Sequence, residues 1–217
     1  MRDELIDGAT VQTERLSRLV EELLTLSRIE DGVLRMSLVA ADAEELVTEA
    51  ARASSTKDRL TVQIDGDGAV VCDVDAVIRV LTNLLDNARK YSPAGTPITL
   101  VVSEETDRIR FVVRDAGPGI AASEREAIFE RFRRGDTTKP GSGLGLYISR
   151  GLIQAHGGEL SVGRAPCGGS EFTFWLPRGA PGERDVAVGS PVDLRLAAIA
   201  DLDTDVTNLT VPTGDPN

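Results

Sequence analysis

The sequence has few of the residues on which disulfide-rich, metal-binding and membrane proteins are built. Its 217 residues include one histidine and two cysteines, and only 4% are aromatic. Two cysteines are too few for a disulfide framework or a cysteine-rich metal site, so we expect Cys72 and Cys167 to be reduced structural thiols. No apolar run approaches the ~20 residues that a membrane-spanning helix needs. We therefore expect no membrane contact from this segment.

Positive charge is also in the minority. The 24 lysines and arginines are outnumbered by 35 acidic residues, which gives a formal net charge of −11. Such a charge disfavours binding to a nucleic-acid backbone. The first residues lack the basic and then apolar pattern of a secretion signal. The chain length is sufficient for one main domain with smaller appendages, in a protein that we expect to be cytoplasmic.

The first segment has a heptad pattern. Leucine or alanine repeats at two core positions between residues 5 and 26: Ala9, Leu16 and Leu23 at one, and Leu5, Leu19 and Leu26 at the other. This pattern predicts a long helix that ends near Gly32 and pairs in a dimeric helical bundle. The alternative is an amphipathic helix that lies on the domain that follows it.

Residues 33–179 alternate between helix and strand patterns. We expect an extended piece at 33–39; helices at 42–54, 73–90 and 144–155; and strands at 60–64, 69–72, 98–103, 109–114, 159–162 and 171–176. The D-G-D-G turn at 65–68 predicts that the first two strands form a hairpin. The fold class is therefore α/β: a two-layer α/β sandwich whose mixed sheet has helices on one face, preceded by a long bundle-type helix.

The last segment, residues 180–217, has seven acidic residues against two basic ones, with several prolines and glycines. This composition predicts a disordered tail. The domain boundaries that we expect are thus 1–32 for the helical segment, 33–179 for the main domain and 180–217 for the tail.

Three short motifs contain the candidate functional residues. In T-N-L-L-D-N-A-R-K-Y (82–91), the helical spacing places Asn83, Asn87 and Lys90 on one face. An asparagine oxygen suits Mg²⁺, and a lysine suits phosphate. The alternative is that the asparagines only form hydrogen bonds to a loop.

The second motif, D-A-G-P-G (115–119), follows a strand. Asp115 is able to accept a hydrogen bond from an exocyclic amine such as that of adenine, and Gly117 and Gly119 allow a close approach to the backbone. A tight turn would explain the glycines equally well.

The third motif, G-S-G-L-G-L (141–146), opens a predicted helix, and backbone N–H groups at such a position bind anions. Before it, Arg131, Arg133, Arg134 and Lys139 lie near Phe129 and Phe132. This basic stretch suggests a lid over a triphosphate, and the alternative is a solvated surface loop.

In this order, over residues 20–177, the motifs resemble the Bergerat-type catalytic and ATP-binding domain of bacterial two-component sensor histidine kinases. The resemblance implies ATP and Mg²⁺ as cofactors, with Asn87 as the metal ligand. It also implies a set of nucleotide-binding residues: Asn83, Asn87, Lys90, Tyr91, Asp115, Gly117, Gly119, Phe132, Arg133, Lys139, Gly141, Gly143, Leu144, Gly145 and Leu146. Ser142 stands where threonine is common in the family.

One feature departs from the family pattern: no histidine precedes the motifs. The family's phosphoacceptor histidine lies on the first dimerisation helix, whereas His156 is downstream, where we expect a structural role. We therefore expect no catalytic residue in this chain and no autophosphorylation. We interpret the chain as the end of a dimerisation region plus the catalytic domain, donating phosphate to a histidine elsewhere, for onward transfer to a response-regulator aspartate.

Two alternatives remain from the sequence. A serine kinase of the anti-sigma-factor type resembles the same ATP domain but lacks the leading helix. A non-catalytic nucleotide-binding dimerisation module would keep the motifs without phosphotransfer. If the parent chain is complete, we also expect a homodimer formed through the helical segment. Such a dimer would be suited to form the cytoplasmic part of a membrane-bound sensor.

Overall fold

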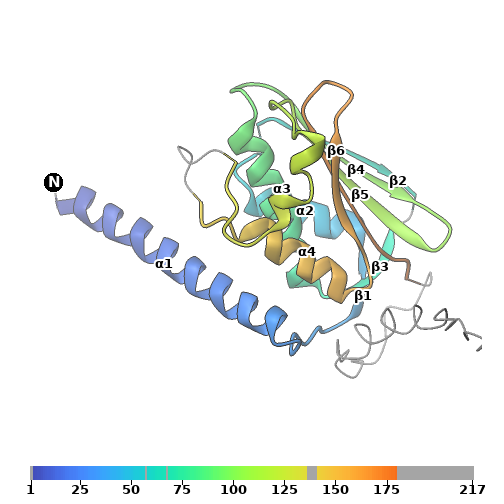
Figure 1. Cartoon of the computed structure of the whole chain (residues 1–217), viewed down its shortest axis with the longest axis horizontal. Coiled ribbons are helices and arrows are strands. Elements are labelled where there is room, and N and C mark those ends of the chain that lie inside the picture. The colour runs from blue at the N-terminus through green and yellow to red at the C-terminus, as the bar shows by residue number, and fades with distance from the viewer. Residues whose placement is uncertain (1, 57, 67, 136–140, 180–217) are drawn as a thin grey trace, which may run out of the picture.

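The computed structural model describes residues 2–56, 58–66, 68–135 and 141–179. These residues form the two-layer α/β sandwich that the sequence predicts, with a sheet on one side and helices packed on the other (Figure 1). Within the described chain, no helix combines the length and apolar character needed to cross a bilayer.

The main sheet has five strands in the order β2-β4-β5-β7-β6. Their bounds are β2 Leu60–Asp65, β4 Ile98–Glu104, β5 Arg108–Arg114, β6 Leu160–Arg164 and β7 Ser170–Pro177. Strand β2 is parallel to β4 and the other pairs are antiparallel, so the sheet is mixed. At its centre the rings of Phe111 and Phe174 stack with centroids 4.7 Å apart.

Three helices cover the inner face of this sheet: α2 Ala43–Ala53, α3 Val74–Tyr91 and α4 Gly145–Ala155. Asp42 caps α2 and Asp73 caps α3; each side chain accepts a hydrogen bond from a backbone N–H of the first turn. The apolar side of α3 is buried at Val77, Val80, Leu81, Leu84, Leu85 and Ala88. The polar residues of the first motif, Asn83, Asn87 and Lys90, therefore lie outside this buried side of α3. Two short 3₁₀ helices, η1 Ala122–Glu124 and η2 Ala127–Phe129, lie between β5 and α4.

The predicted hairpin over residues 60–72 is wrong. Strand β2 pairs with β4, whereas β3 (Ala69–Cys72) pairs antiparallel with β1 (Val39–Asp42), a strand that the sequence analysis missed. Gly66 and Gly68 have positive φ angles of 103° and 56°. The glycines thus form a turn as expected, but the chain leaves the plane of the main sheet there instead of folding back along β2.

The first helix, α1 (Arg2–Glu30), projects from the sandwich, and only its last turns pack on it (Figure 1). Leu26 is buried, a Cβ on Gly151 of α4 would lie 2.8 Å from Ile29, and Arg79 of α3 donates to the hydroxyl of Thr25 at 2.9 Å. Earlier apolar residues are exposed, namely Leu16, Val20, Leu23 and Leu24. The end of α1 thus lies on the domain, and pairing of its exposed residues in a dimer stays a prediction.

His156 and Cys72 lie in the interior, as a structural role requires. Both ring nitrogens of His156 are occupied: Nε2 accepts from the Asp73 N–H at 2.9 Å, and Nδ1 lies 2.7 Å from the Leu152 carbonyl. Burial lowers the pKa of His156, so its neutral form is favoured. Burial also raises the pKa of the Cys72 thiol to about 12. Cys72 and Cys167 are both free thiols, and Cys167 is exposed.

Candidate nucleotide-binding site

The first and third motifs meet where α3 packs against α4. A Cβ on Gly145 would overlap Oδ1 of Asn83, so only glycine fits at this position of α4. The amide of Asn83 also donates a hydrogen bond of 2.9 Å to the hydroxyl of Ser149, one turn further along α4. These contacts fix Asn83, and they bring together motifs separated by about sixty residues of sequence.

The same two motifs also approach each other at the end of α3. A Cβ on Gly141 would lie 3.1 Å from Nζ of Lys90. That ammonium lies 4.8 Å from the ring centroid of Tyr91, which is a cation–π distance. The Lys90 charge is therefore positioned beside the glycine loop, where an anionic phosphate would sit.

Asp115 lies at the end of β5 and is 4% exposed. Its Oδ1 accepts from the N–H of Gly117 at 2.7 Å and from the N–H of Ser170 at 3.0 Å. Among the described residues, both hydrogen bonds to the carboxylate use Oδ1, which leaves Oδ2 for a further donor. A carboxylate fixed in this way is suited to read an exocyclic amine.

The second motif also contacts the end of α3. A Cβ on Gly117 would lie 3.0 Å from the carbonyl oxygen of Tyr91, and the N–H of Ala116 donates to the hydroxyl of Ser92 at 3.3 Å. Gly119 has a φ of +75°, and a side chain there would lie 2.9 Å from the carbonyl oxygen of Gly168. Because a side chain at Gly117 or Gly119 would crowd these backbone oxygens, the close packing of this loop depends on glycine at both positions.

The third motif is packed against Phe132. A Cβ on Gly143, which has a φ of +75°, would lie 2.7 Å from the carbonyl carbon of Phe132. Phe132 itself is 59% exposed and has a φ of 60°, the single positive value among the described non-glycine residues. Backbone strain of this kind is concentrated at functional sites. Leu144 is buried and Leu146 packs on the core, so these leucines anchor the start of α4.

The basic stretch is only partly described. Arg131 forms an ion pair of 2.7 Å with Glu30 of α1, and Arg133 lies 3.9 Å from Glu124. Neither contact is with the three motifs, so a phosphate-binding role for Arg133 stays a prediction. Lys139 lies outside the described residues.

Asn87 lies on the same helix as Asn83 and Lys90 and is half-buried. No hydrogen bond to its side chain is found among the described residues, which suits a ligand oxygen that is kept free. The described part of the chain holds no cluster of three or more His, Cys, Asp or Glu side chains able to bind a metal. The residues present therefore fit Mg²⁺ held by one amide oxygen, with phosphates and water as its other ligands.

The structure adds supporting residues that the sequence analysis missed. Ser149 and Ser170 hold Asn83 and Asp115, and Glu22 of α1 accepts a hydrogen bond of 2.7 Å from the hydroxyl of Ser142. Ser149 follows Gly145 by four residues on α4, so helical spacing was a usable signal for it. The Glu22 contact spans 120 residues and left no local signal.

Comparison with known proteins agrees with this geometry. Residues 72–180 match the family described as histidine kinase-, DNA gyrase B- and HSP90-like ATPases, and the chain belongs to that family. This matched region contains all three motifs, from the asparagine helix to the glycine-rich start of α4.

Within that family, the similar proteins are sensor kinases. The chain is 34% identical over 185 residues to the sensor protein KdpD of Clostridium acetobutylicum, covering 82% of this chain and 21% of that one. The structure of the mycobacterial sensor histidine kinase MprB has a TM-score of 0.58 and 31% identity, with 65% of this chain and 98% of that chain covered. Full-length ShkA in complex with AMPPNP has a TM-score of 0.65 and 31% identity, with 76% and 36% covered. The described domain is therefore the ATP-binding catalytic domain of a sensor histidine kinase.

The chain spans only 21–49% of the length of the first four curated relatives. The activity, substrates and partners of a whole sensor kinase are therefore matters for proposal.

Proposed function

We propose that this chain is a phosphodonor module, which binds ATP with Mg²⁺ and transfers the γ-phosphoryl group to a histidine that is not present in this sequence. The observation that supports the donor role best is the state of His156, the one histidine of the sequence. Its ring is 6% exposed and both nitrogens are hydrogen-bonded. Such a ring is poorly suited to in-line attack on a phosphorus atom, which needs a free nitrogen lone pair.

In the proposed site each motif has one task. Asp115 Oδ2 accepts from the adenine amine, while Tyr91, Gly117 and Gly119 line the base. Asn83 and Lys90 face the phosphates together with Gly141, Gly143, Leu144, Gly145 and Leu146 at the start of α4. Phe132 and Arg133 belong to the stretch that covers the phosphates. Asn87 holds Mg²⁺, which supplies charge neutralisation on the phosphates.

We further propose that the acceptor histidine passes the phosphate to an aspartate of a response regulator in the cytoplasm. Related sensor kinases support a partner of this class in general. The leading helix α1 favours this assignment over an anti-sigma-factor type of serine kinase. The exposed leucines of α1 are the surface through which a homodimer would form.

The test is to incubate the chain with γ-labelled ATP and Mg²⁺, alone and with a histidine-bearing dimerisation fragment of a related kinase. We expect label on the fragment and none on the chain. Acid-labile label on the chain itself would contradict the donor role. ATP binding without any phosphate transfer would instead indicate a non-catalytic nucleotide-binding module.

The metal assignment has its own test in the same mixture. Replacing Asn87 by alanine removes the ligand oxygen, and we expect transfer to fall at least about tenfold and its Mg²⁺ requirement to rise. Arg89→Ala, an exposed neighbour on α3, is the matched control. An unchanged Mg²⁺ dependence in Asn87→Ala would move the metal to other residues.

A further inference from the structure

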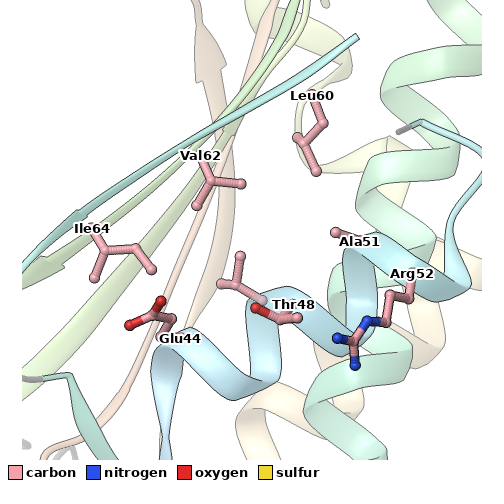
Figure 2. A pocket seen from close by; sticks show the side chains of 8 residues that line it. Glu44, Thr48, Ala51, Arg52, Leu60, Val62 and Ile64 are labelled. Carbon is pink, nitrogen blue, oxygen red and sulfur yellow. The ribbon is translucent and has the colours of Figure 1, made fainter. Parts of the chain in front are cut away.

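A groove of about 630 Å³ lies on the side of the domain formed by α2 and β2. Its lining combines apolar and polar side chains: Leu60, Val62 and Ile64 of β2 lie across from Thr48 and Ala51 of α2, with Glu44 and Arg52 towards its two ends (Figure 2). None of these residues belongs to the nucleotide-binding motifs. The groove is therefore a separate surface with no role in the proposed phosphotransfer.

Strand β2 is an edge strand, because it ends the order of the main sheet and pairs only with β4 in the described structure. Val62 and Ile64 are 40% and 37% exposed, so two β-branched side chains face the groove at an open edge. Proteins usually cover such an edge, since it otherwise promotes aggregation. A covering segment is thus expected here.

The described chain ends beside one end of this groove. The N–H of Gly179 donates to the carbonyl of Ala69 at 2.8 Å, and the neighbouring Gly68 carbonyl accepts from the N–H of Ala43 at 2.9 Å. Ala43 precedes Glu44, which lines the groove at the same end as Ile64 (Figure 2). Residues that follow Gly179 therefore start at the Glu44 end.

The sequence after Gly179 contains a matching apolar pattern. Val192, Leu196, Ile199 and Ala200 have the spacing of one helical face. In a helix this stripe would be ~12 Å long, and β2 from Leu60 to Ile64 spans ~13 Å. The thirteen residues from Gly179 to Val192 would reach at most ~45 Å when extended, which is ample.

The charge at one end of the groove also agrees with this direction. Asp203 follows Ile199 by one helical turn, so it would lie towards Arg52. Arg52 pairs with Glu49 only in an exposed ion pair, which contributes little and is readily exchanged.

We propose that residues 192–203 bind the α2–β2 groove of their own chain, antiparallel to β2, with Val192, Leu196 and Ile199 against Val62 and Ile64. The occupant is the chain's own acidic C-terminal segment because it starts at the groove, matches its length and brings Asp203 towards Arg52. It binds as an intramolecular cover for the edge strand.

Limited trypsin cleavage of the full chain tests this directly. Arg184 and Arg195 are the only lysine or arginine residues after Gly179, and intact mass separates the two products. Docking protects Arg195, and Val62→Asp should raise its initial cleavage rate about tenfold if the docked form outnumbers the free form about ten to one. Cleavage at Arg184 should stay unchanged.

Gln63→Asp is the matched control, since it adds the same charge one residue along β2 on the opposite face. Ile199→Asp tests the other partner without touching the folded domain or the residues next to the Arg195 cleavage site, and it should also remove protection at Arg195. If thermal unfolding shows folded protein and neither Val62→Asp nor Ile199→Asp changes the Arg195 rate, the proposal is wrong. Protection that grows with protein concentration would overturn it in favour of a second copy.

Discussion

At the scale of single residues, the candidate site is held by contacts between distant parts of the chain. The Asp115 carboxylate is fixed by the Ser170 N–H, and the Asn83 amide is fixed by the Ser149 hydroxyl. These hydrogen bonds orient polar groups that would otherwise turn towards water. The residues that bind a ligand are therefore defined as much by their supporting partners as by their own chemistry.

Gly145→Ala tests the contact between α3 and α4. The added methyl would overlap Oδ1 of Asn83 and break its hydrogen bond to Ser149. We expect the free energy of unfolding to fall by about 1–3 kcal/mol and ATP affinity to fall about tenfold, measured by urea denaturation and calorimetry. Gly163→Ala on β6, where the nearest atom to an added Cβ is 4.0 Å away, should change neither quantity. Equal effects of the two substitutions would argue against the steric cause.

His156→Gln tests the buried imidazole through the pH dependence of stability. Because burial lowers the pKa of His156, the unfolded chain binds its proton at a higher pH than the folded chain does. The stability that the neutral buried ring contributes is therefore fully present above the ordinary histidine pKa of 6.5. It is lost as the pH falls below that value. We expect the wild type to lose more unfolding free energy than His156→Gln between pH 7 and pH 5, measured by urea denaturation. Parallel curves would contradict a neutral buried histidine.

At the scale of elements, α1 has two surfaces with different partners. Its last turns contact α3, α4 and the third motif through Thr25, Ile29 and Glu22. The apolar residues before them face solvent in the single chain. One helix thus joins the nucleotide site to a surface that is available for a second helix.

Ile29→Asp and Leu23→Asp separate these two surfaces. Ile29 packs on Gly151, so we expect Ile29→Asp to lower the free energy of unfolding by about 2 kcal/mol, measured at low protein concentration. Leu23 is 51% exposed, so Leu23→Asp should change stability by less than about 0.5 kcal/mol. Leu23→Asp should instead weaken any dimer seen by sedimentation. If Leu23→Asp lowered stability and Ile29→Asp did not, α1 would pack on the domain through the face that contains Leu23.

At the scale of the whole molecule, an acidic protein has to bind an acidic ligand. The net charge of −11 opposes a triphosphate, so we propose that binding depends on local groups: Lys90, the N–H groups before α4 and the basic stretch after η2. Because the site joins α3, α4 and β5, a bound nucleotide stabilises the folded domain as a unit.

Asp115→Asn tests this coupling. At a nucleotide concentration of about one hundred times Kd, ATP should add about 2.7 kcal/mol to the unfolding free energy of the wild type. In Asp115→Asn we expect most of this gain to be lost, measured as the ATP-dependent shift in Tm. Asp107→Asn, in the turn between β4 and β5, should keep the full shift. The same shift in Asp115→Asn would mean that the base is read elsewhere.

Local patterns in the sequence determined most elements and the content of the site. Period-3.6 apolar spacing predicted α1, α2, α3 and α4, because helices form from contacts within a few residues. The motifs were likewise local, so their residue types already implied a nucleotide, and the matched family agrees.

The tertiary structure determined which strands pair and which residues meet. The D-G-D-G turn predicted a hairpin that does not form, because β2 pairs with β4 and β3 pairs with β1, in each case a strand that is not its neighbour along the chain. The contacts of Asn83 with Gly145, of Asp115 with Ser170 and of Glu22 with Ser142 span 55 residues or more. Such contacts depend on how the whole chain packs, whereas a sequence pattern reflects only interactions between residues that are close along the chain.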